Sequence, residues 1–267
     1  MKRILTLILA LSMVFCFAAC GKTNENPDNN ATGNEVADTT AKTELVMATN
    51  ATFPPYEFYE GEKIVGIDAE IAEKIAEKLG MTLKIQDTEF GSIIAGVQTG
   101  KFDIGMAGMT VTEERLKTVN FSTSYATGVQ SIIVPEGSPI KSVDDLSPEL
   151  KIGVQQDTTG HIYASDSVEN GGYGEEAVIP FNKGTDAVAA LVSGKVDCVI
   201  IDNEPAKSYV AANEGLVILD TEYVTENYAI CVAKDNEELL AKINKALDEL
   251  IADGTVDSII SKYISAE

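Results

Sequence analysis

Short apolar runs alternate with amphipathic helical patterns along the chain, and this alternation limits the possible fold more than any other feature. The clearest helical pattern repeats an apolar residue at every fourth position from Ile67 to Leu79, with Asp68 as a candidate cap and Gly80 as the stop. Strands that alternate with helices predict an α/β fold, in which a parallel sheet carries helices on its faces. For this first unit we expect strands at 44–49, 83–85 and 102–106, and helices at 67–79 and 93–99.

A second unit of similar layout follows the first. Residues 95–104 and 189–198 both read as the end of a helix, a Gly stop, a Lys and then a strand that carries Asp. One such match is poor evidence for a repeat, but it indicates a second α/β unit. We expect its strands at 151–154, 177–180, 197–201 and 216–219, and its main helix at 185–193, capped by Thr185.

Two strand-like segments, 125–134 and 224–231, cross between these units and suggest a hinge. Helical patterns at 239–251 and 256–263 complete the first unit if the second crossing returns the chain there. We therefore expect two α/β lobes joined by a two-strand hinge. Lobe 1 would be 44–125 plus 230–267, and lobe 2 would be 126–229.

The N-terminus reads as a targeting segment. Lys2 and Arg3 precede an apolar stretch, 4–17, that is too short to span a bilayer comfortably. The next residues, Phe17-Ala-Ala-Cys20, resemble the bacterial lipobox, although Phe17 stands where Leu is usual. We expect a signal peptide at 1–19, a lipidated Cys20 and a polar, disordered tether through 43. Ordinary cleavage or an uncleaved anchor are the alternatives.

Composition excludes several classes of function. The formal net charge of −22 argues against nucleic acid as a partner, because a phosphate backbone demands a basic surface. Cys198 and Cys231 lie in apolar runs, which favours two buried thiols over a disulfide. His161 is the only histidine and no CxxC occurs. A metal site and a His-based catalytic triad are therefore unsupported, and we expect no cofactor.

The stretch from Gly108 to Arg115 carries the strongest local signal for function. It follows an apolar run, and Thr112 is a good N-cap for a helix that starts with two Glu residues. Free N–H groups at a helix start favour an anion, and the planar guanidinium of Arg115 matches a carboxylate. The turn therefore predicts a site for the carboxylate of a small molecule. Pairing of Arg115 with Glu113 or Glu114 on a solvated face is the alternative.

Residues 44–267 resemble the solute-binding proteins of ATP-binding-cassette importers, of the amino-acid (family 3) type. Each matching piece is weak alone, but their order and spacing behind a lipobox are specific. The pieces are 48–57 (ATNATFPPYE), 66–70 (GIDAE), 107–115 (AGMTVTEER) with Phe121-Ser122, 153–156 (GVQQ) with 158–160 (TTG), and 196–202.

The resemblance implies a ligand cleft between the lobes and assigns residues to it. Arg115 would bind the α-carboxylate of an amino acid, and Asp202 its α-ammonium. Phe53 and Phe90 would form aromatic walls, while Asn50 and Gln155 would select the side chain. The full set of expected ligand-binding residues is Asn50, Phe53, Phe90, Gly108, Met109, Thr110, Arg115, Gln155, Thr158, Thr159 and Asp202. As plain alternatives, the two Phe residues belong to the core and Asp202 caps a helix.

The resemblance also implies a binding function rather than an enzymatic one. We expect a lipid-anchored, extracytoplasmic monomer that closes on a free amino acid and delivers it to the membrane subunits of the permease. A small-acid dehydratase of similar fold and a ligand-sensing module are the rivals. The expected ligand is polar and not acidic, because no second cation lies at the wall positions. Neutral polar and basic side chains both stay open, with a slight preference for neutral polar.

Overall fold

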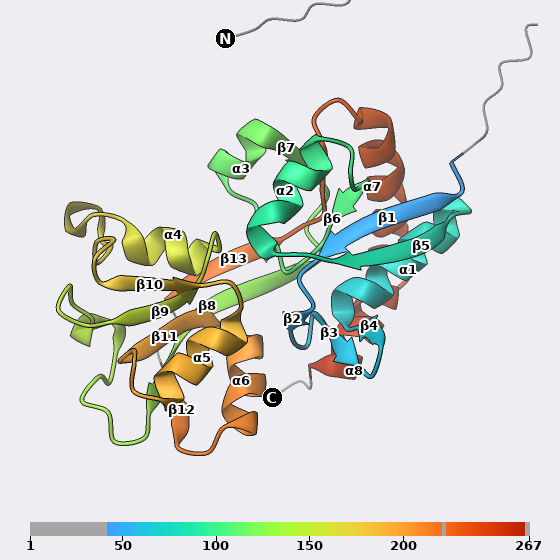
Figure 1. The fold of residues 1–267 in the computed structure, drawn as a ribbon. Helices are drawn as coiled ribbons and strands as arrows, with labels where there is room; N and C mark the ends of the chain where they lie inside the picture. Colours follow the sequence, from blue (N-terminus) through green and yellow to red (C-terminus); the bar gives the residue numbers. More distant parts are fainter. Residues whose placement is uncertain (1–41, 221–222, 265–267) are drawn as a thin grey trace, which may run out of the picture. The chain divides into compact units, whose positions relative to one another are not determined.

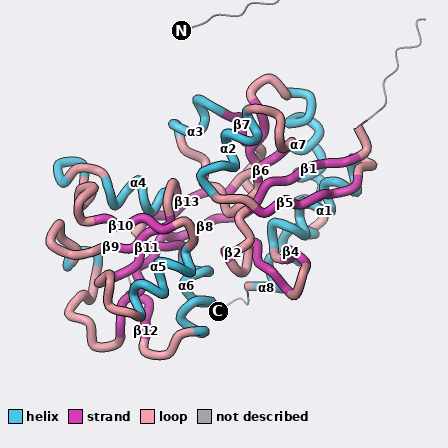
Figure 2. The backbone as a smooth tube through the Cα atoms, viewed as in Figure 1, coloured by secondary structure: helices cyan, strands magenta, loops and turns pink. Residues whose placement is uncertain are grey.

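Two sheets and one small hairpin sheet organise the part of the chain described by this computed structural model, residues 42–220 and 223–264 (Figures 1 and 2). These residues belong to one compact unit. The predicted signal peptide and Cys20 lie outside the described residues. The helices are α1 (Ile67–Leu79), α2 (Phe90–Gln98), α3 (Glu113–Thr118), α4 (Thr159–Ser165), α5 (Gly184–Val192), α6 (Asn203–Ala212), α7 (Glu237–Ala252) and α8 (Thr255–Tyr263).

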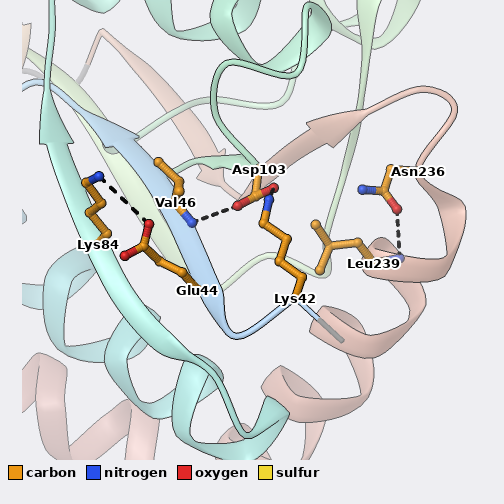
Figure 3. Close-up of polar contacts among 7 residues, drawn as sticks. All are labelled: Lys42, Glu44, Val46, Lys84, Asp103, Asn236 and Leu239. Carbon is orange, nitrogen blue, oxygen red and sulfur yellow. Dashed lines mark hydrogen bonds and ion pairs between the residues drawn. The ribbon is translucent and has the colours of Figure 1, made fainter. Parts of the chain in front are cut away.

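The first sheet has the strand order β5-β1-β6-β14-β7. Its strands are β1 (Glu44–Thr49), β5 (Thr82–Asp87), β6 (Ile104–Gly105), β7 (Val119–Phe121) and β14 (Cys231–Ala233). β1 pairs in parallel with β5 and β6, whereas β14 runs antiparallel to its neighbours β6 and β7. Asp103 holds the start of β1, since it accepts a hydrogen bond from the Val46 N–H at 2.7 Å and pairs with Lys42 (Figure 3).

The second sheet has the order β10-β9-β11-β8-β12, and β13 also pairs with β8. Its strands are β8 (Ala126–Pro135), β9 (Ile152–Gln155), β10 (Val178–Phe181), β11 (Cys198–Asp202), β12 (Leu216–Ile218) and β13 (Val224–Tyr228). Both faces of β11 are buried. Val199 and Ile201 pack in one hydrophobic cluster, and Cys198 and Ile200 pack in another.

Strands β8 and β13 join the parts of the chain that carry the two sheets. They pair antiparallel from Ala126 with Tyr228 to Gln130 with Val224. Figure 1 shows them side by side, β8 in green and β13 in orange. The chain leaves the first sheet after β7 and returns to it at β14, and α7 and α8 then pack against α1. This is the predicted α/β fold of two lobes joined by two strands. We call the part built on the first sheet lobe 1 and the part built on the second sheet lobe 2.

Local predictions were right for most elements and wrong at several ends. Asp68 does not cap α1, which starts after Gly66, and Thr185 does not cap α5, which starts after Lys183 without a side-chain cap. The expected strand 224–231 is two strands, because β13 belongs to one sheet and β14 to the other. Helices α4 and α6 and the hairpin sheet of β2 (Thr52–Phe53), β3 (Glu57–Glu60) and β4 (Lys63–Val65) were not predicted.

Two further findings concern thiols and membrane helices. Cys198 and Cys231 are free and buried, as expected, and burial raises the pKa of each thiol to about 12. Within the described ranges, no helix combines the length and the apolar character needed to cross a bilayer.

Candidate ligand-binding cleft

Polar and aromatic side chains gather around one cavity, which has about 320 Å³ of empty space when the part open to solvent is counted. Several of them lie at or just beyond the carboxyl ends of parallel strands, where α/β folds place their ligands. Ten of the eleven predicted residues line it: Asn50, Phe53, Phe90, Gly108, Thr110, Arg115, Gln155, Thr158, Thr159 and Asp202. The eleventh, Met109, is fully buried in a hydrophobic cluster of lobe 1.

Arg115 lies in α3 and is only 8% exposed. The helix begins as predicted, because the Thr112 hydroxyl accepts the Arg115 N–H at 3.1 Å. Nη1 donates to the Thr110 carbonyl at 2.8 Å, and Nη2 donates to the Asp157 carbonyl at 2.9 Å. Burial lowers the pKa of the guanidinium, and the Glu226 carboxylate opposes that shift. Arg has five N–H donors, so three remain for a ligand.

Asp202 ends β11 and does not cap the following helix with its side chain. Its carboxylate instead accepts from Gln130 Nε2 at 2.8 Å and from the Tyr228 hydroxyl. Burial, together with the nearby Glu226 carboxylate, raises the pKa of Asp202 to about 7, although the two hydrogen bonds act in the other direction. Asp202 thus occupies the N-cap position of α6 without a side-chain capping bond, and it lines the cavity.

Glu226, on the hinge strand β13, connects both lobes beneath the cavity. One of its carboxylate oxygens accepts from the Thr110 hydroxyl at 3.0 Å, the Thr159 hydroxyl at 2.9 Å and Gln130 Nε2 at 3.1 Å. Thr110 belongs to lobe 1, whereas Thr159 and Gln130 belong to lobe 2. The sequence analysis missed Glu226. Its burial could have been inferred from the two-residue alternation of the strand, which places Glu226 on the same buried face as Tyr228.

Glu57, the first residue of β3, lines the cavity at 1% exposure and was also missed. Among the described residues no donor hydrogen-bonds to either of its carboxyl oxygens, and its near polar neighbour is another carboxyl group, that of Asp68. Burial, followed by the nearby Asp68 carboxylate, raises its pKa well above the usual value. Asp68 itself accepts from the Gly108 N–H and the Tyr125 hydroxyl, both at 2.9 Å, and burial raises its pKa to about 6.

The aromatic walls lie in lobe 1. Phe90 is the first residue of α2, and its ring lies 5.3 Å from the Arg115 guanidinium carbon, within the range of a cation–π contact. Phe53 lies against Gly108, whose φ of 51° and close approach leave no room for a side chain, since a Cβ there would sit 2.8 Å from the Phe53 ring. A Gly residue is therefore required where Phe53 meets the turn that leads to α3.

The two amides expected to select the ligand side chain bind each other across the lobes. Gln155 Nε2 donates to Asn50 Oδ1 at 3.0 Å, and Asn50 Nδ2 donates to the Thr88 carbonyl at 2.8 Å. Their hydrogen-bonding capacity is thus largely used within the protein. Glu57, whose carboxyl oxygens receive no donor from the described residues, is a further polar group that lines the cavity.

This geometry defines a class of protein, the two-lobed binding proteins that hold a small molecule between their lobes. A guanidinium and buried carboxyl groups line the same cavity, which matches a ligand that carries both charges.

Comparison with known proteins assigns the family. Residues 45–266 match the family of bacterial extracellular solute-binding proteins, family 3. The chain is 33% identical to the arginine-binding extracellular protein ArtP of Bacillus subtilis (strain 168), over all of both chains. It is 31% identical to the glutamine-binding protein GlnH of the same organism, over 100% of this chain and 99% of GlnH.

A solved structure, an ancestral arginine-binding protein bound to arginine, is 41% identical with a TM-score of 0.78, and covers 84% of this chain and 99% of its own. A second solved structure, an ancestral arginine-binding protein bound to glutamine, is 40% identical with a TM-score of 0.78. The chain therefore belongs to the bacterial extracellular solute-binding proteins, family 3.

Proposed function

We propose that this protein is the substrate-binding component of an ATP-binding-cassette importer and that its ligand is a basic amino acid of the arginine or lysine type. The observation that carries the proposal is Glu57, a buried carboxyl group in the cavity with no partner for either oxygen. A buried unpaired acceptor costs roughly 1–3 kcal/mol, and more if it is charged. A cationic ligand side chain would supply the missing donors.

The balance of buried charge supports the same ligand. Among the described residues, the buried carboxyl groups are Glu57, Asp68, Asp202 and Glu226, whereas Arg115 is the one buried cation. An amino acid with a cationic side chain adds two positive charges and one negative charge. Its carboxylate would bind Arg115 and the Thr159 hydroxyl, its ammonium Asp202, and its side chain Glu57 between the rings of Phe53 and Phe90. Two arginine-binding relatives, ArtP and the ancestral protein, agree with this choice.

Glutamine is the second candidate, and the raised pKa of Glu57 favours it. A protonated Glu57 carboxyl can donate to a neutral amide, and GlnH is a relative named for glutamine. The sequence alone slightly favoured a neutral polar ligand, because Asn50 and Gln155 were expected to face it. Because Asn50 and Gln155 bind each other instead, Glu57 is the polar group expected to contact the ligand side chain, and this favours a cationic side chain.

The proposed action is binding without turnover. We infer that the lobes, divided as predicted into 44–125 plus 230–267 and 126–229, close on the ligand about the β8–β13 pair, since a ligand that contacts both lobes favours the closed state. The protein would act as a monomer, held at the membrane by a lipid on Cys20 and presenting the closed form to the permease. A dehydratase would instead consume a small acid in this cleft.

Calorimetric titration of a Glu57→Gln variant tests the ligand. We expect its affinity for arginine to fall by roughly 1.5–3 kcal/mol, the worth of one charge-assisted hydrogen bond, while glutamine affinity changes little or rises. Glu62→Gln, which removes an exposed carboxylate from the same hairpin, is the matched control and should bind as the wild type does. Unchanged arginine affinity in Glu57→Gln would refute the assignment of the side-chain site.

A further inference from the structure

We propose that Asp157 is a positioning residue that links the two lobes beside the ligand cavity and so contributes to the affinity for the ligand. We call its contacts with Arg115 and Gly91 of lobe 1 the clasp. The inference goes beyond the proposed function, because Asp157 does not line the ligand cavity and the argument needs no ligand identity. Three contacts of Asp157 support it: one within lobe 2 and two with residues of lobe 1.

The first contact fixes an unusual backbone. Asp157 has a φ of 63°, and among the described residues it is the one non-glycine residue with positive φ. Asp tolerates this region better than most residues but is seldom found there. Its N–H donates to His161 Nδ1 at 3.1 Å, and the flanking Thr158 hydroxyl donates to the Gln155 carbonyl at 2.8 Å. The turn between β9 and α4 is therefore held in one conformation.

The second contact crosses to lobe 1 through the backbone. The carbonyl of Asp157 accepts from Arg115 Nη2 at 2.9 Å, while the Thr110 carbonyl accepts from Nη1 at 2.8 Å. The guanidinium is thus fixed from lobe 1 on one side and from lobe 2 on the other. Because the conformation of residue 157 aims its carbonyl at Arg115, the turn positions the group that would bind the ligand carboxylate.

The third contact crosses to lobe 1 through the side chain. Gly91 is the second residue of α2, and a Cβ built there would lie 2.1 Å from Asp157 Oδ2. The N-cap residue of α2, Glu89, makes no side-chain capping bond, and its own carboxylate accepts from Asn182 at 3.2 Å. A carboxylate at the positive end of a helix is stabilised by the exposed N–H groups there. The carboxylate of Asp157, a residue of lobe 2, thus lies near the N-terminus of α2 in lobe 1.

Contacts that exist only when the lobes are together favour the closed state. Ligand affinity depends on how readily the closed state forms, because the ligand contacts both lobes only there. Asp157 therefore contributes to affinity without touching the ligand. Its contribution should be equal for different amino acids, which distinguishes it from a residue that selects the side chain.

A double-mutant cycle across the cleft tests the clasp. Asp157→Gly removes the carboxylate and accepts positive φ, whereas Gly91→Ala places a methyl group where the carboxylate lies. We expect each single variant to weaken arginine binding about two- to fivefold, and the double variant to bind no more weakly than the weaker single variant. Ser92→Ala, in the same helical turn, is the control and should bind normally. Additive losses, or affinities within experimental error of the wild type, would overturn the clasp.

Amide hydrogen exchange in lobe 1 distinguishes the clasp from a purely local role of the turn, because a local role would leave exchange in lobe 1 unchanged. Asp157→Asn keeps the tolerance for positive φ but removes the charge. We expect faster amide exchange at residues 91–93, in the other lobe, with unchanged exchange in the core strand β11. Unchanged exchange at 91–93 would contradict the contact. Exchange is compared with and without a bound amino acid, because the contact forms only when the lobes are together; any amino acid that binds serves, so the test does not depend on the proposed choice of ligand.

Discussion

At the residue scale, charge decides what the cleft can hold. Arg115 is fixed by two backbone carbonyls, and the carboxylates of Asp202 and Glu226 share the Gln130 amide. These side chains come from different elements, so each alone looks ordinary in the sequence. Their meaning comes from the fold, which places one guanidinium and several carboxylates around a single cavity.

Removal of Arg115 should abolish binding while the fold survives. We expect Arg115→Ala to lose about 2–5 kcal/mol of binding free energy, because the ligand carboxylate would be buried without a partner. Calorimetry measures the loss, and circular dichroism checks that the variant is folded. Lys117→Ala, which removes an exposed cation from the same helix, is the control. Near-normal affinity in Arg115→Ala would show that the ligand carboxylate lies elsewhere.

Binding should release protons near neutral pH. Asp202, with a pKa of about 7, and Asp68, with a pKa of about 6, carry protons part of the time in the empty cleft. A ligand ammonium favours the ionised carboxylates, so it displaces these protons, and affinity should rise between about pH 5.5 and about pH 8. Titrations at about pH 6.5 in two buffers with different ionisation enthalpies count the protons. Asp202→Asn should release fewer; equal release would exclude Asp202 as their source.

The residue roles could be anticipated only in part. Sequence resemblance brought out the residues at strand ends, such as Asn50 and Asp202, because they lie in short recognisable motifs. Glu57 was missed although it ends the matching piece 48–57, because no period of apolar residues around it marks a buried strand. Its burial depends on how the hairpin packs beside the cavity, which no local pattern encodes.

At the element scale, tertiary contacts override local capping preferences. Asp68 has the sequence position of a cap, yet its carboxylate binds the Gly108 N–H of a distant turn and leaves α1 to begin after Gly66. Thr112 does cap α3, and Thr158, which lines the cavity, caps α4 by accepting the His161 N–H. The two Thr hydroxyls therefore cap helices beside the site, whereas the Asp68 carboxylate is taken by a distant turn.

The hinge pair tolerates little change at Gly128. This residue lies opposite Glu226 in the β8–β13 pair, and a Cβ there would sit 2.1 Å from the Tyr228 hydroxyl oxygen. We expect Gly128→Ala to lower the free energy of unfolding by about 1–3 kcal/mol through overpacking, and to weaken ligand binding through displacement of Tyr228 from Asp202. Urea unfolding measures the first effect, with exposed Thr127→Ala as control. A variant as stable as the wild type would mean that the strands shift freely.

At the scale of the whole molecule, the two-lobed α/β fold was predictable and its finer connections were not. Alternation from Ile67 onward identified the sheets, because buried parallel strands and amphipathic helices have different periods. The division of residues 224–233 between two sheets was not visible, since both halves have the pattern of an extended strand. Which sheet a strand joins is decided by pairing over long distances in the chain, as in the return of β14 to β6.

Attachment to the membrane should depend on Cys20. Lasting association needs two or more lipid signals, which a lipobox cysteine receives on one residue. We expect Cys20→Ser to move the protein from the membrane fraction to the soluble extracytoplasmic fraction. Cys16→Ser, within the apolar stretch, should leave the distribution unchanged and serves as the control. Full retention of Cys20→Ser with the membrane would indicate an uncleaved anchor.

The most direct test of the central claim is a calorimetric titration of the protein with arginine, lysine, glutamine, glutamate and leucine under one set of conditions. The account predicts that a basic amino acid binds most tightly, with glutamine next, because Glu57 presents unpartnered acceptors inside a cavity rich in carboxylates. If glutamate or leucine bound most tightly, the proposed ligand would be wrong. Glutamate would add a negative charge to a cavity already rich in carboxyl groups, and leucine would leave Glu57 without a polar partner.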